Sequence, residues 1–180
     1  MMLRIFNQIK MLYYRVFCDN ISVYRKRGMK IGNGCSIYTW NFLEECYLIE
    51  IGDNVQITAG VRIFTHGGGY VLRKLCPNFD SFGKVCIGNN VYIGNNAMIM
   101  PGVTIGNNVV IGAGSIVTKN VPDGVVIAGN PAKIVGSIDN YRDKYLQYNL
   151  DCKHMKGQEK KKYLLSLPDE RFLKVKGTLK

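Results

Sequence analysis

The chain has 180 residues, of which 47% are hydrophobic, and a formal net charge of +11. This length suits one domain, and the hydrophobic content can supply a core, so intrinsic disorder is not indicated. The excess of positive charge favours polyanionic partners: nucleic acid, an anionic lipid surface or a phosphorylated ligand. Because no zinc-finger spacing, RNP-like strand or basic recognition helix is present, we expect no nucleic-acid partner and favour a phosphate-rich ligand.

The cysteines and the apolar runs point to a reducing compartment. None of the six cysteines forms a CxxC pair, so we interpret them as buried small hydrophobic residues. They are Cys18, Cys35, Cys46, Cys76, Cys86 and Cys152. No run of 18 apolar residues exists, so no membrane-spanning helix is predicted, and Arg4, Lys10 and Arg15 interrupt any signal-peptide core. We therefore expect a cytoplasmic protein.

Residues 2–24 place apolar side chains near helical spacing, with basic and amide side chains off that stripe. The stripe contains Leu3, Phe6, Ile9, Tyr13, Val16 and Phe17. We predict one amphipathic helix within an N-terminal cap of residues 1–30. The helix could cover the open end of the following domain. As a basic helix bearing aromatic residues, it could instead lie on anionic lipid at the inner face of a membrane.

A six-residue period governs residues 31–136, and it is clearest after residue 84. An aliphatic residue returns every sixth position, at Ile87, Ile93, Ile99, Ile105, Ile111 and Val117. A second small or aliphatic set runs four places behind, at Val91, Ala97, Val103, Val109, Ser115 and Val121. Because six is neither the period of a helix nor that of a strand, a repeating supersecondary unit is required. A hexapeptide period is typical of a parallel β-helix, whose coils have about three short flat faces.

The residues between the aliphatic positions are mostly Gly and Asn, as at 88–90, 94–96 and 106–108. These residue types tolerate the positive-φ corners that tight turns demand. The period slips through residues 38–45 and breaks again at 67–84, where glycines and a proline punctuate a basic, aromatic stretch. We predict a β-helix domain of residues 31–136 with a loop at 67–84 that leaves the solenoid.

After Val135 the period is absent, and we predict a basic C-terminal extension of residues 137–180. Tyrosine and leucine spacing indicates one short helix between residues 141 and 148, and residues 160–165 indicate a second, which Pro168 would end. We interpret this extension as a cap or a solvated segment.

A close resemblance to a known family lies in residues 87–135, which read IGNNVYIGNNAMIMPGVTIGNNVVIGAGSIVTKNVPDGVVIAGNPAKIV. They resemble the C-terminal half of hexapeptide-repeat acetyltransferases of the maltose, galactoside and polysaccharide O-acetyltransferase group. The resemblance extends over residues 31–136. It implies a left-handed coil, acetyl-CoA as co-substrate, a sugar or glycan acceptor, and a homotrimer with its clefts between subunits.

His66 is the candidate catalytic base. It lies where the repeat is violated, and functional groups on repeat scaffolds sit at such positions because a regular coil satisfies its own backbone. An imidazole is the natural base for acetyl transfer to a hydroxyl, since its ordinary pKa near 6.5 leaves it mostly neutral at physiological pH. The family places its histidine after the aliphatic residue of a third hexad, and Thr65-His66-Gly67 matches that place.

The attack is expected to be direct, because no Ser or Cys nucleophile is placed with a base and an orienting group. A carboxylate is expected to orient the imidazole, and the candidates are Glu50, Asp53 and Asp80. No metal is expected: a carbonic-anhydrase-like β-helix needs three histidines, and the chain has two.

The resemblance implies contacts with coenzyme A at Asn95, Ala113, Thr118, Lys119 and Lys133. In this interpretation the main-chain N–H of Asn95 faces the thioester carbonyl, while Lys119 and Lys133 meet the nucleotide phosphates. On the acceptor side, Trp40 and Asn41 roughly match an Asn-Phe pair of the family.

The excursion loop carries Arg73 and differs from that of the small-sugar enzymes, so it could admit a larger or anionic glycan. Two other functions stay open: N-acetylation of a nucleotide-linked amino sugar, and a non-catalytic β-helix scaffold.

Overall fold

The computed structural model describes residues 19–42 and 45–174. Most of the helix expected at 2–24 therefore lies outside the described residues. Its described neighbour is helix α2 (Asn20–Lys26), which begins after Asp19. The Asp19 side chain accepts a hydrogen bond of 2.9 Å from the Ser22 N–H, as an N-cap should.

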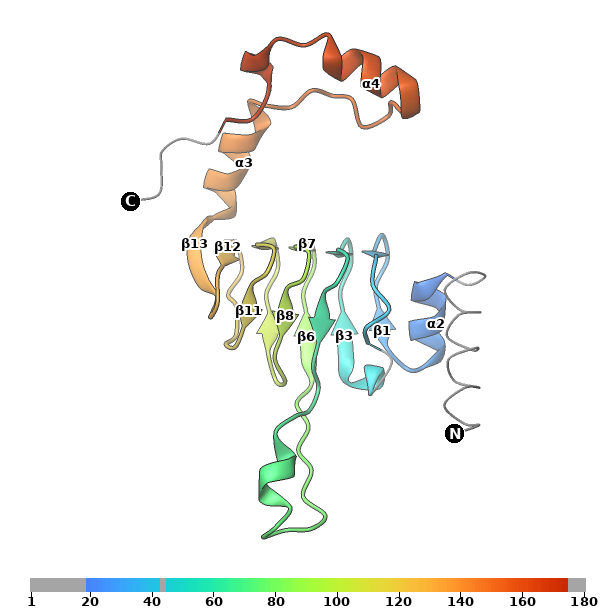
Figure 1. The fold of residues 1–180 in the computed structure, drawn as a ribbon, viewed down its shortest axis with the longest axis vertical. Coiled ribbons are helices and arrows are strands. Elements are labelled where there is room, and N and C mark those ends of the chain that lie inside the picture. Colours follow the sequence, from blue (N-terminus) through green and yellow to red (C-terminus); the bar gives the residue numbers. More distant parts are fainter. Residues whose placement is uncertain (1–18, 43–44, 175–180) are drawn as a thin grey trace. The chain divides into compact units, whose positions relative to one another are not determined.

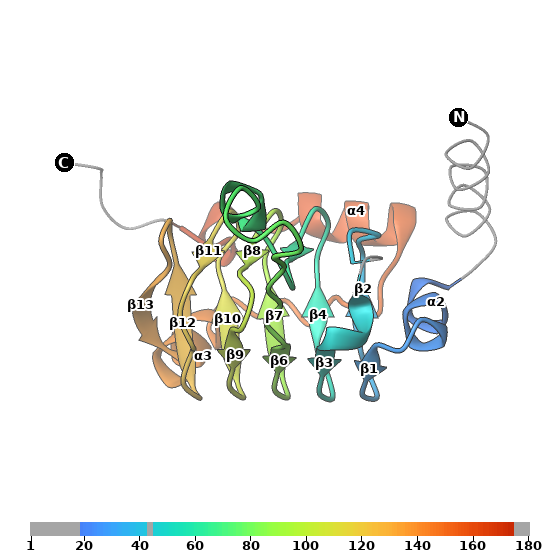
Figure 2. The ribbon, with the colours of Figure 1, turned by 90° about the horizontal axis from the view of Figure 1, so that it is seen from below.

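The chain forms stacked coils, and the short strands of successive coils pair into three sheets (Figures 1 and 2). The first sheet contains β1 (Lys30–Ile31), β3 (Ile49–Ile51), β6 (Val85–Ile87) and β9 (Thr104–Ile105). The second contains β2 (Ser36–Ile37), β4 (Gln56–Ile57), β7 (Val91–Ile93), β10 (Val109–Ile111), β12 (Val125–Ala128) and β13 (Lys133–Ser137). The third contains β5 (Arg62–Ile63), β8 (Met98–Ile99) and β11 (Ile116–Val117).

Consecutive strands of the chain enter different sheets, and neighbours within a sheet are parallel, apart from β13, which is antiparallel to β12. Equivalent hexad positions are in register, so Ile57, Ile93 and Ile111 lie directly above one another. This architecture fits the left-handed parallel β-helix expected from the sequence.

Burial confirms the six-residue period. Every residue of both repeating sets between positions 87 and 121 is at most 7% exposed. The aliphatic side chains stack inside the coils, and full burial of each contributes about 1.5–3 kcal/mol. The solenoid core is thus a column of Ile and Val side chains.

The corners use their Asn and Gly residues for two different purposes. Asn90, Asn96 and Asn108 have φ values of 55°, 59° and 54°, in the left-handed region that Asn tolerates. Gly88 instead provides space, because a Cβ there would lie 2.8 Å from the carbonyl oxygen of Gly106 in the next coil. The coils can approach this closely only where no side chain intervenes.

The expected excursion leaves the stack between β5 and β6 and contains the 3₁₀ turn η2 (Gly69–Leu72) (Figure 1). Its two ends are fastened together. His66 and Phe82 form an antiparallel bridge, and the Gly83 N–H donates to the Thr65 carbonyl at 2.7 Å. The loop therefore closes where the coil resumes.

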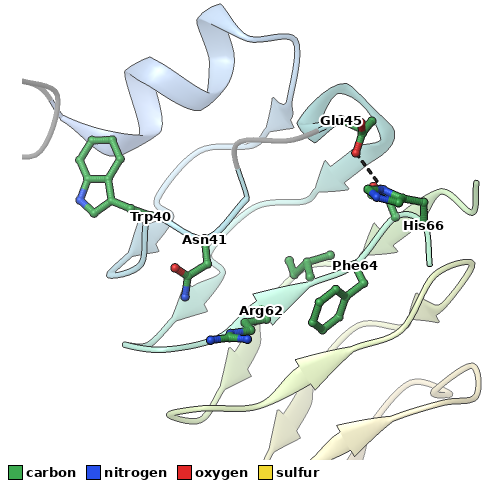
Figure 3. A pocket seen from close by; sticks show the side chains of 8 residues that line it. Trp40, Asn41, Glu45, Arg62, Phe64 and His66 are labelled. Carbon is green, nitrogen blue, oxygen red and sulfur yellow. Dashed lines mark ion pairs between the residues drawn. The ribbon is translucent and has the colours of Figure 1, made fainter. Parts of the chain in front are cut away.

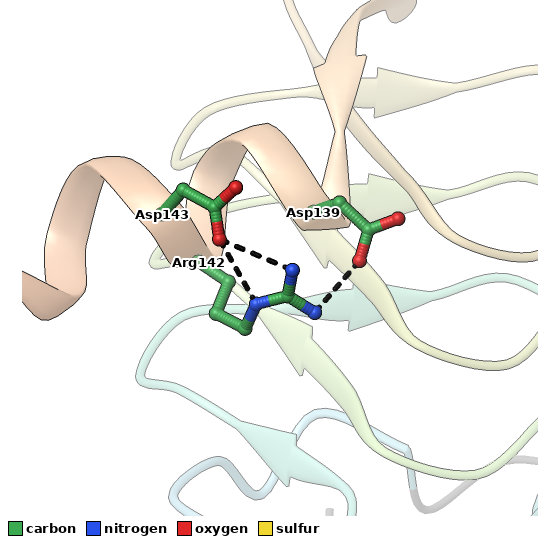
Figure 4. A network of polar contacts seen from close by, with 3 residues as sticks. All are labelled: Asp139, Arg142 and Asp143. Carbon is green, nitrogen blue, oxygen red and sulfur yellow. Dashed lines mark hydrogen bonds and ion pairs between the residues drawn. The ribbon is translucent and has the colours of Figure 1, made fainter.

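Residues from Asp139 onward form a separate compact unit. It contains α3 (Ile138–Leu146, whose first residue belongs to the solenoid unit), α4 (Gly157–Leu165) and the 3₁₀ turn η3 (Asp169–Arg171). Helices are present where the sequence indicated them, and α4 ends before Pro168. The Arg142 guanidinium lies between two carboxylates, with its nitrogens 2.8 Å from Oδ1 of Asp139 and 3.1 Å from Oδ1 of Asp143 (Figure 4). Such exposed ion pairs add little stability.

Within the described ranges, no helix is long and apolar enough to cross a bilayer. The prediction of buried cysteines is wrong for most of those described: Cys46 is buried and Cys76 exposed, while Cys35, Cys86 and Cys152 are half-buried. The physical reason at Cys76 is its place in the excursion, outside the column of core side chains. Cys18 lies outside the described residues.

Replacing Gly88 by Ala is expected to lower the free energy of unfolding by about 1–3 kcal/mol, the usual cost of overpacking. The added methyl would press on backbone of the next coil. Gly136→Ala is the control, because a Cβ at Gly136 would meet no atom within 4 Å. Denaturant unfolding of both variants measures the difference. Equal stability of the two would contradict the close-approach explanation.

Acid should weaken the hydrogen bonds that join the corners of successive coils, because Asp123 accepts two of them from Asn107. The backbone N–H and then the side-chain amide of Asn107 hold the pKa of Asp123 below its ordinary value of 3.8. A lowered folded-state pKa adds stability that is present above the unfolded-state pKa and is lost as the pH falls through the folded-state value. Asp123→Asn is therefore expected to flatten the fall in unfolding free energy below about pH 4. An unchanged slope in Asp123→Asn would contradict this role of the carboxylate.

Candidate functional site

The chain along β5 and beyond alternates between core and surface. Val61, Ile63 and Thr65 are buried, so Arg62, Phe64 and His66 project from the opposite face. The extended backbone continues past the strand, since the Phe64 N–H donates to the Ile99 carbonyl at 2.9 Å. Three outward side chains thus share the surface of the third sheet.

A pocket of about 440 Å³ lies over this surface (Figure 3). Its lining consists of Trp40, Asn41, Glu45, Arg62, Ile63, Phe64, Thr65 and His66. Sequence reasoning singled out Trp40, Asn41 and His66, and the structure brings all three to this pocket. It missed Arg62 and Phe64, although the two-residue alternation that places them beside His66 is visible in the sequence.

His66 faces a carboxylate. Its Nδ1 lies 2.9 Å from Oε2 of Glu45, and the two side chains are 39% and 25% exposed. Both atoms are buried from solvent, and neither has a well-aligned hydrogen-bond partner among the described residues. The contact is thus a close approach that becomes a full ion pair when the imidazole takes a proton. The His66 ring also packs on Phe82, with 5.4 Å between ring centroids.

The expected orienting carboxylates are corrected by this geometry. Glu50 pairs with the Lys30 Nζ at 2.7 Å, and this hydrogen bond lowers the pKa of Glu50. Asp53 accepts from the Asn33 N–H at 2.6 Å, and Asp80 accepts from the N–H of the next residue at 3.1 Å. Each is committed elsewhere, and Glu45 takes the place beside the imidazole.

Glu45 belongs to the segment where the repeat slips, just before the 3₁₀ turn η1 (Cys46–Leu48). Its φ of 41° puts it in the left-handed region, which is uncommon for a residue with a long side chain. Strained conformations of this kind cluster at functional sites. No periodic signal distinguishes Glu45 from its neighbours in the sequence, which is why pattern reasoning missed it.

Trp40 and Asn41 are held in place by contacts with α2 and with the residue before β5. The Trp40 ring packs against Tyr24 of α2 at 6.1 Å between centroids, and the Asn41 amide donates to the Val61 carbonyl at 3.4 Å. Arg73 is not among the pocket residues. It lies in the excursion, where its Nε donates to the Phe79 carbonyl at 3.3 Å.

The five residues expected to contact coenzyme A are exposed and lie on or next to the third sheet. Asn95 and Ala113 occupy the corner before it in successive coils, where the Gly114 N–H donates to the Asn95 carbonyl at 2.8 Å. Thr118 and Lys119 directly follow β11. Lys133 follows Ala132, whose N–H donates to the Ile116 carbonyl of β11 at 2.9 Å.

Comparison with known proteins identifies the family. The family model described as "Bacterial transferase hexapeptide (six repeats)" matches residues 87–119. Protein CapG of Staphylococcus aureus is 49% identical over 164 residues, which cover 88% of this chain and 95% of CapG. The chain belongs to the hexapeptide-repeat acetyltransferase family. The family and the enzyme class expected from the sequence are thereby confirmed.

Solved structures of this family share the fold. A maltose O-acetyltransferase from Clostridium difficile 630 superposes with a TM-score of 0.53 at 33% identity, over 64% of this chain and 73% of its own. A galactoside acetyltransferase in complex with coenzyme A gives a TM-score of 0.51 at 29% identity, over 68% and 71%.

Proposed function

We propose that this acetyltransferase moves an acetyl group from acetyl-CoA to a hydroxyl of a sugar or glycan, with His66 as the general base. The observation that carries the proposal is the approach of His66 to Glu45 at 2.9 Å, inside a pocket that also offers aromatic and amide side chains. Aromatic rings such as Trp40 and Phe64 suit the apolar faces of sugars, and Asn41 suits their hydroxyls.

The division of labour on the imidazole follows from its contacts. Nδ1 faces Glu45, and Nε2 makes no hydrogen bond within the described part of the chain. In the proposed step Nε2 takes the acceptor hydroxyl proton as the oxygen attacks the thioester carbonyl. A C–O bond forms, the C–S bond breaks, and the proton passes from the imidazole to the departing thiolate. Glu45 stabilises the transient imidazolium without itself being protonated.

The donor side of the reaction is assigned to exposed groups of the later coils. The N–H of Asn95 has no hydrogen-bond partner in the described ranges, so it is free to donate to the developing oxyanion, a contact worth roughly 3 kcal/mol. Lys119 and Lys133 have no carboxylate partner among the described residues and suit the phosphates of coenzyme A. Coenzyme A bound to a galactoside acetyltransferase supports this assignment.

A homotrimer is part of the proposal. Asn95 precedes β8 and His66 follows β5, so within one chain they lie at opposite ends of the parallel strands of the third sheet. A second copy packed along this sheet would set Asn95 of one subunit close to His66 of its neighbour. Cyclic association of this kind forms one cleft at each subunit interface. A role in polysaccharide biosynthesis follows if the acceptor is a glycan precursor.

His66→Ala is expected to lower kcat roughly 10²- to 10⁴-fold, the usual contribution of a general base, while acetyl-CoA still binds. Turnover is followed as release of coenzyme A with a panel of sugar and glycan acceptors. His154→Ala removes the other histidine, in the extension, and should leave kcat unchanged. Full activity of His66→Ala would contradict the base role and favour a non-catalytic scaffold.

Mild alkali should release the acetyl group from an ester product, whereas an amide product would persist.

Glu45→Gln keeps the size of the side chain but removes the charge that faces Nδ1. We expect kcat to fall roughly ten-fold or more, because the counter-charge is needed only while the imidazole is protonated during the reaction. The KM for acetyl-CoA should not change. Glu50→Gln removes a carboxylate that pairs with Lys30 instead and should not change kcat. If both variants behave alike, Glu45 is not the positioning residue.

A further inference from the structure

Arg62 is an uncommitted cation in the acceptor pocket. Its side chain is exposed on β5, lines the pocket with His66, and makes no hydrogen bond or ion pair among the described residues. The residues in register with it along the third sheet are Met98 and then Ile116, neither of which is acidic. Among the described residues that line the pocket, the acidic one is Glu45, and it faces the imidazole instead.

The separation between Arg62 and His66 sets how far the reacting hydroxyl of an acceptor lies from a group that binds Arg62. Figure 3 shows Arg62 and Asn41 at one end of the pocket and the His66–Glu45 pair at the other. Three residues of extended chain lie between Arg62 and His66, so their Cα atoms are about 14 Å apart at most. Phe64 lies between them on the same face. A hydroxyl at His66 therefore leaves room for about one or two sugar rings before a group that meets the guanidinium.

We propose that Arg62 binds an anionic group of the acceptor, a carboxylate or a phosphate, so that the enzyme acetylates acidic rather than neutral sugars. A planar guanidinium binds both groups through two parallel N–H donors, which fixes orientation as well as charge. The amide of Asn41 at the same end supplies a further polar contact. The inference rests on the proposed function, because it concerns the acceptor of that same reaction.

The test compares acceptors that differ only in charge. A neutral oligosaccharide, its uronate counterpart and the corresponding sugar phosphate are offered to the wild type and to Arg62→Gln. The wild type should prefer at least one anionic acceptor in kcat/KM, and Arg62→Gln should lose roughly ten- to a hundred-fold on that acceptor alone. Preference for the uronate or for the phosphate identifies the source of the charge. Arg62→Lys, which keeps the charge without the fork, should fall between the two.

Arg142→Gln is the matched control, because Arg142 lies on α3, pairs with Asp139 and Asp143, and does not line the pocket. It should keep the preference for the anionic acceptor. An equal loss on neutral and anionic acceptors in Arg62→Gln, or no loss on either, would overturn the inference. So would a rise in the KM for acetyl-CoA, since Arg62 would then serve the cofactor.

Calorimetric binding without acetyl-CoA separates this inference from the proposed function. Anionic oligosaccharide should bind the wild type more tightly than Arg62→Gln, and the neutral one should bind both equally. If the wild type acetylates no acceptor but this binding difference is present, the proposed reaction fails and the anion site stands. If acetylation proceeds but binding does not depend on charge, the anion site fails and the reaction stands.

Discussion

The hydrogen-bonded register between successive coils is the constraint on which the rest of the molecule depends. It sets Ile57 below Ile93 and Ile93 below Ile111, and thereby decides which side chain of each hexad points inward. The same register decides what points outward. Since Ile63 must join the core column, Arg62 and Phe64 are forced onto the surface that carries His66. The candidate site is therefore a by-product of core packing along one strand.

The candidate site lies where this regularity fails twice. One failure is the excursion after residue 66, which leaves the imidazole beside a bridge to Phe82 instead of inside another hexad. The other is the slip before β3, which puts Glu45 into a left-handed conformation at the edge of the stack. A perfect solenoid would bury or satisfy both groups. The two irregular segments face each other across 2.9 Å and so make a pair that neither coil contains alone.

The sequence predicted the fold well because a six-residue period has few physical solutions. The two repeating sets, the Asn corners and the excursion were all legible as residue types at fixed spacing. His66 was legible for the same reason, as the point where the spacing stops. Glu45 was not, because irregular backbone carries no period, and Glu50, Asp53 and Asp80 were equally plausible by residue type. Glu50 and Asp53 are committed to partners in the neighbouring coil, and Asp80 accepts from the N–H of the next residue.

The stack also separates the regular later coils from the pocket. The family model matches residues 87–119, the stretch that contains Asn95, Ala113 and Lys119 on the proposed donor side. The proposed acceptor pocket lies entirely in residues 40–66, before that stretch begins. The regular later coils thus carry the residues proposed for the donor, and the earlier segments carry the pocket beside the proposed base. The lining of this pocket combines the Arg62 guanidinium with the aromatic rings of Trp40 and Phe64, which suits the proposed selection of acceptors by charge as well as by shape.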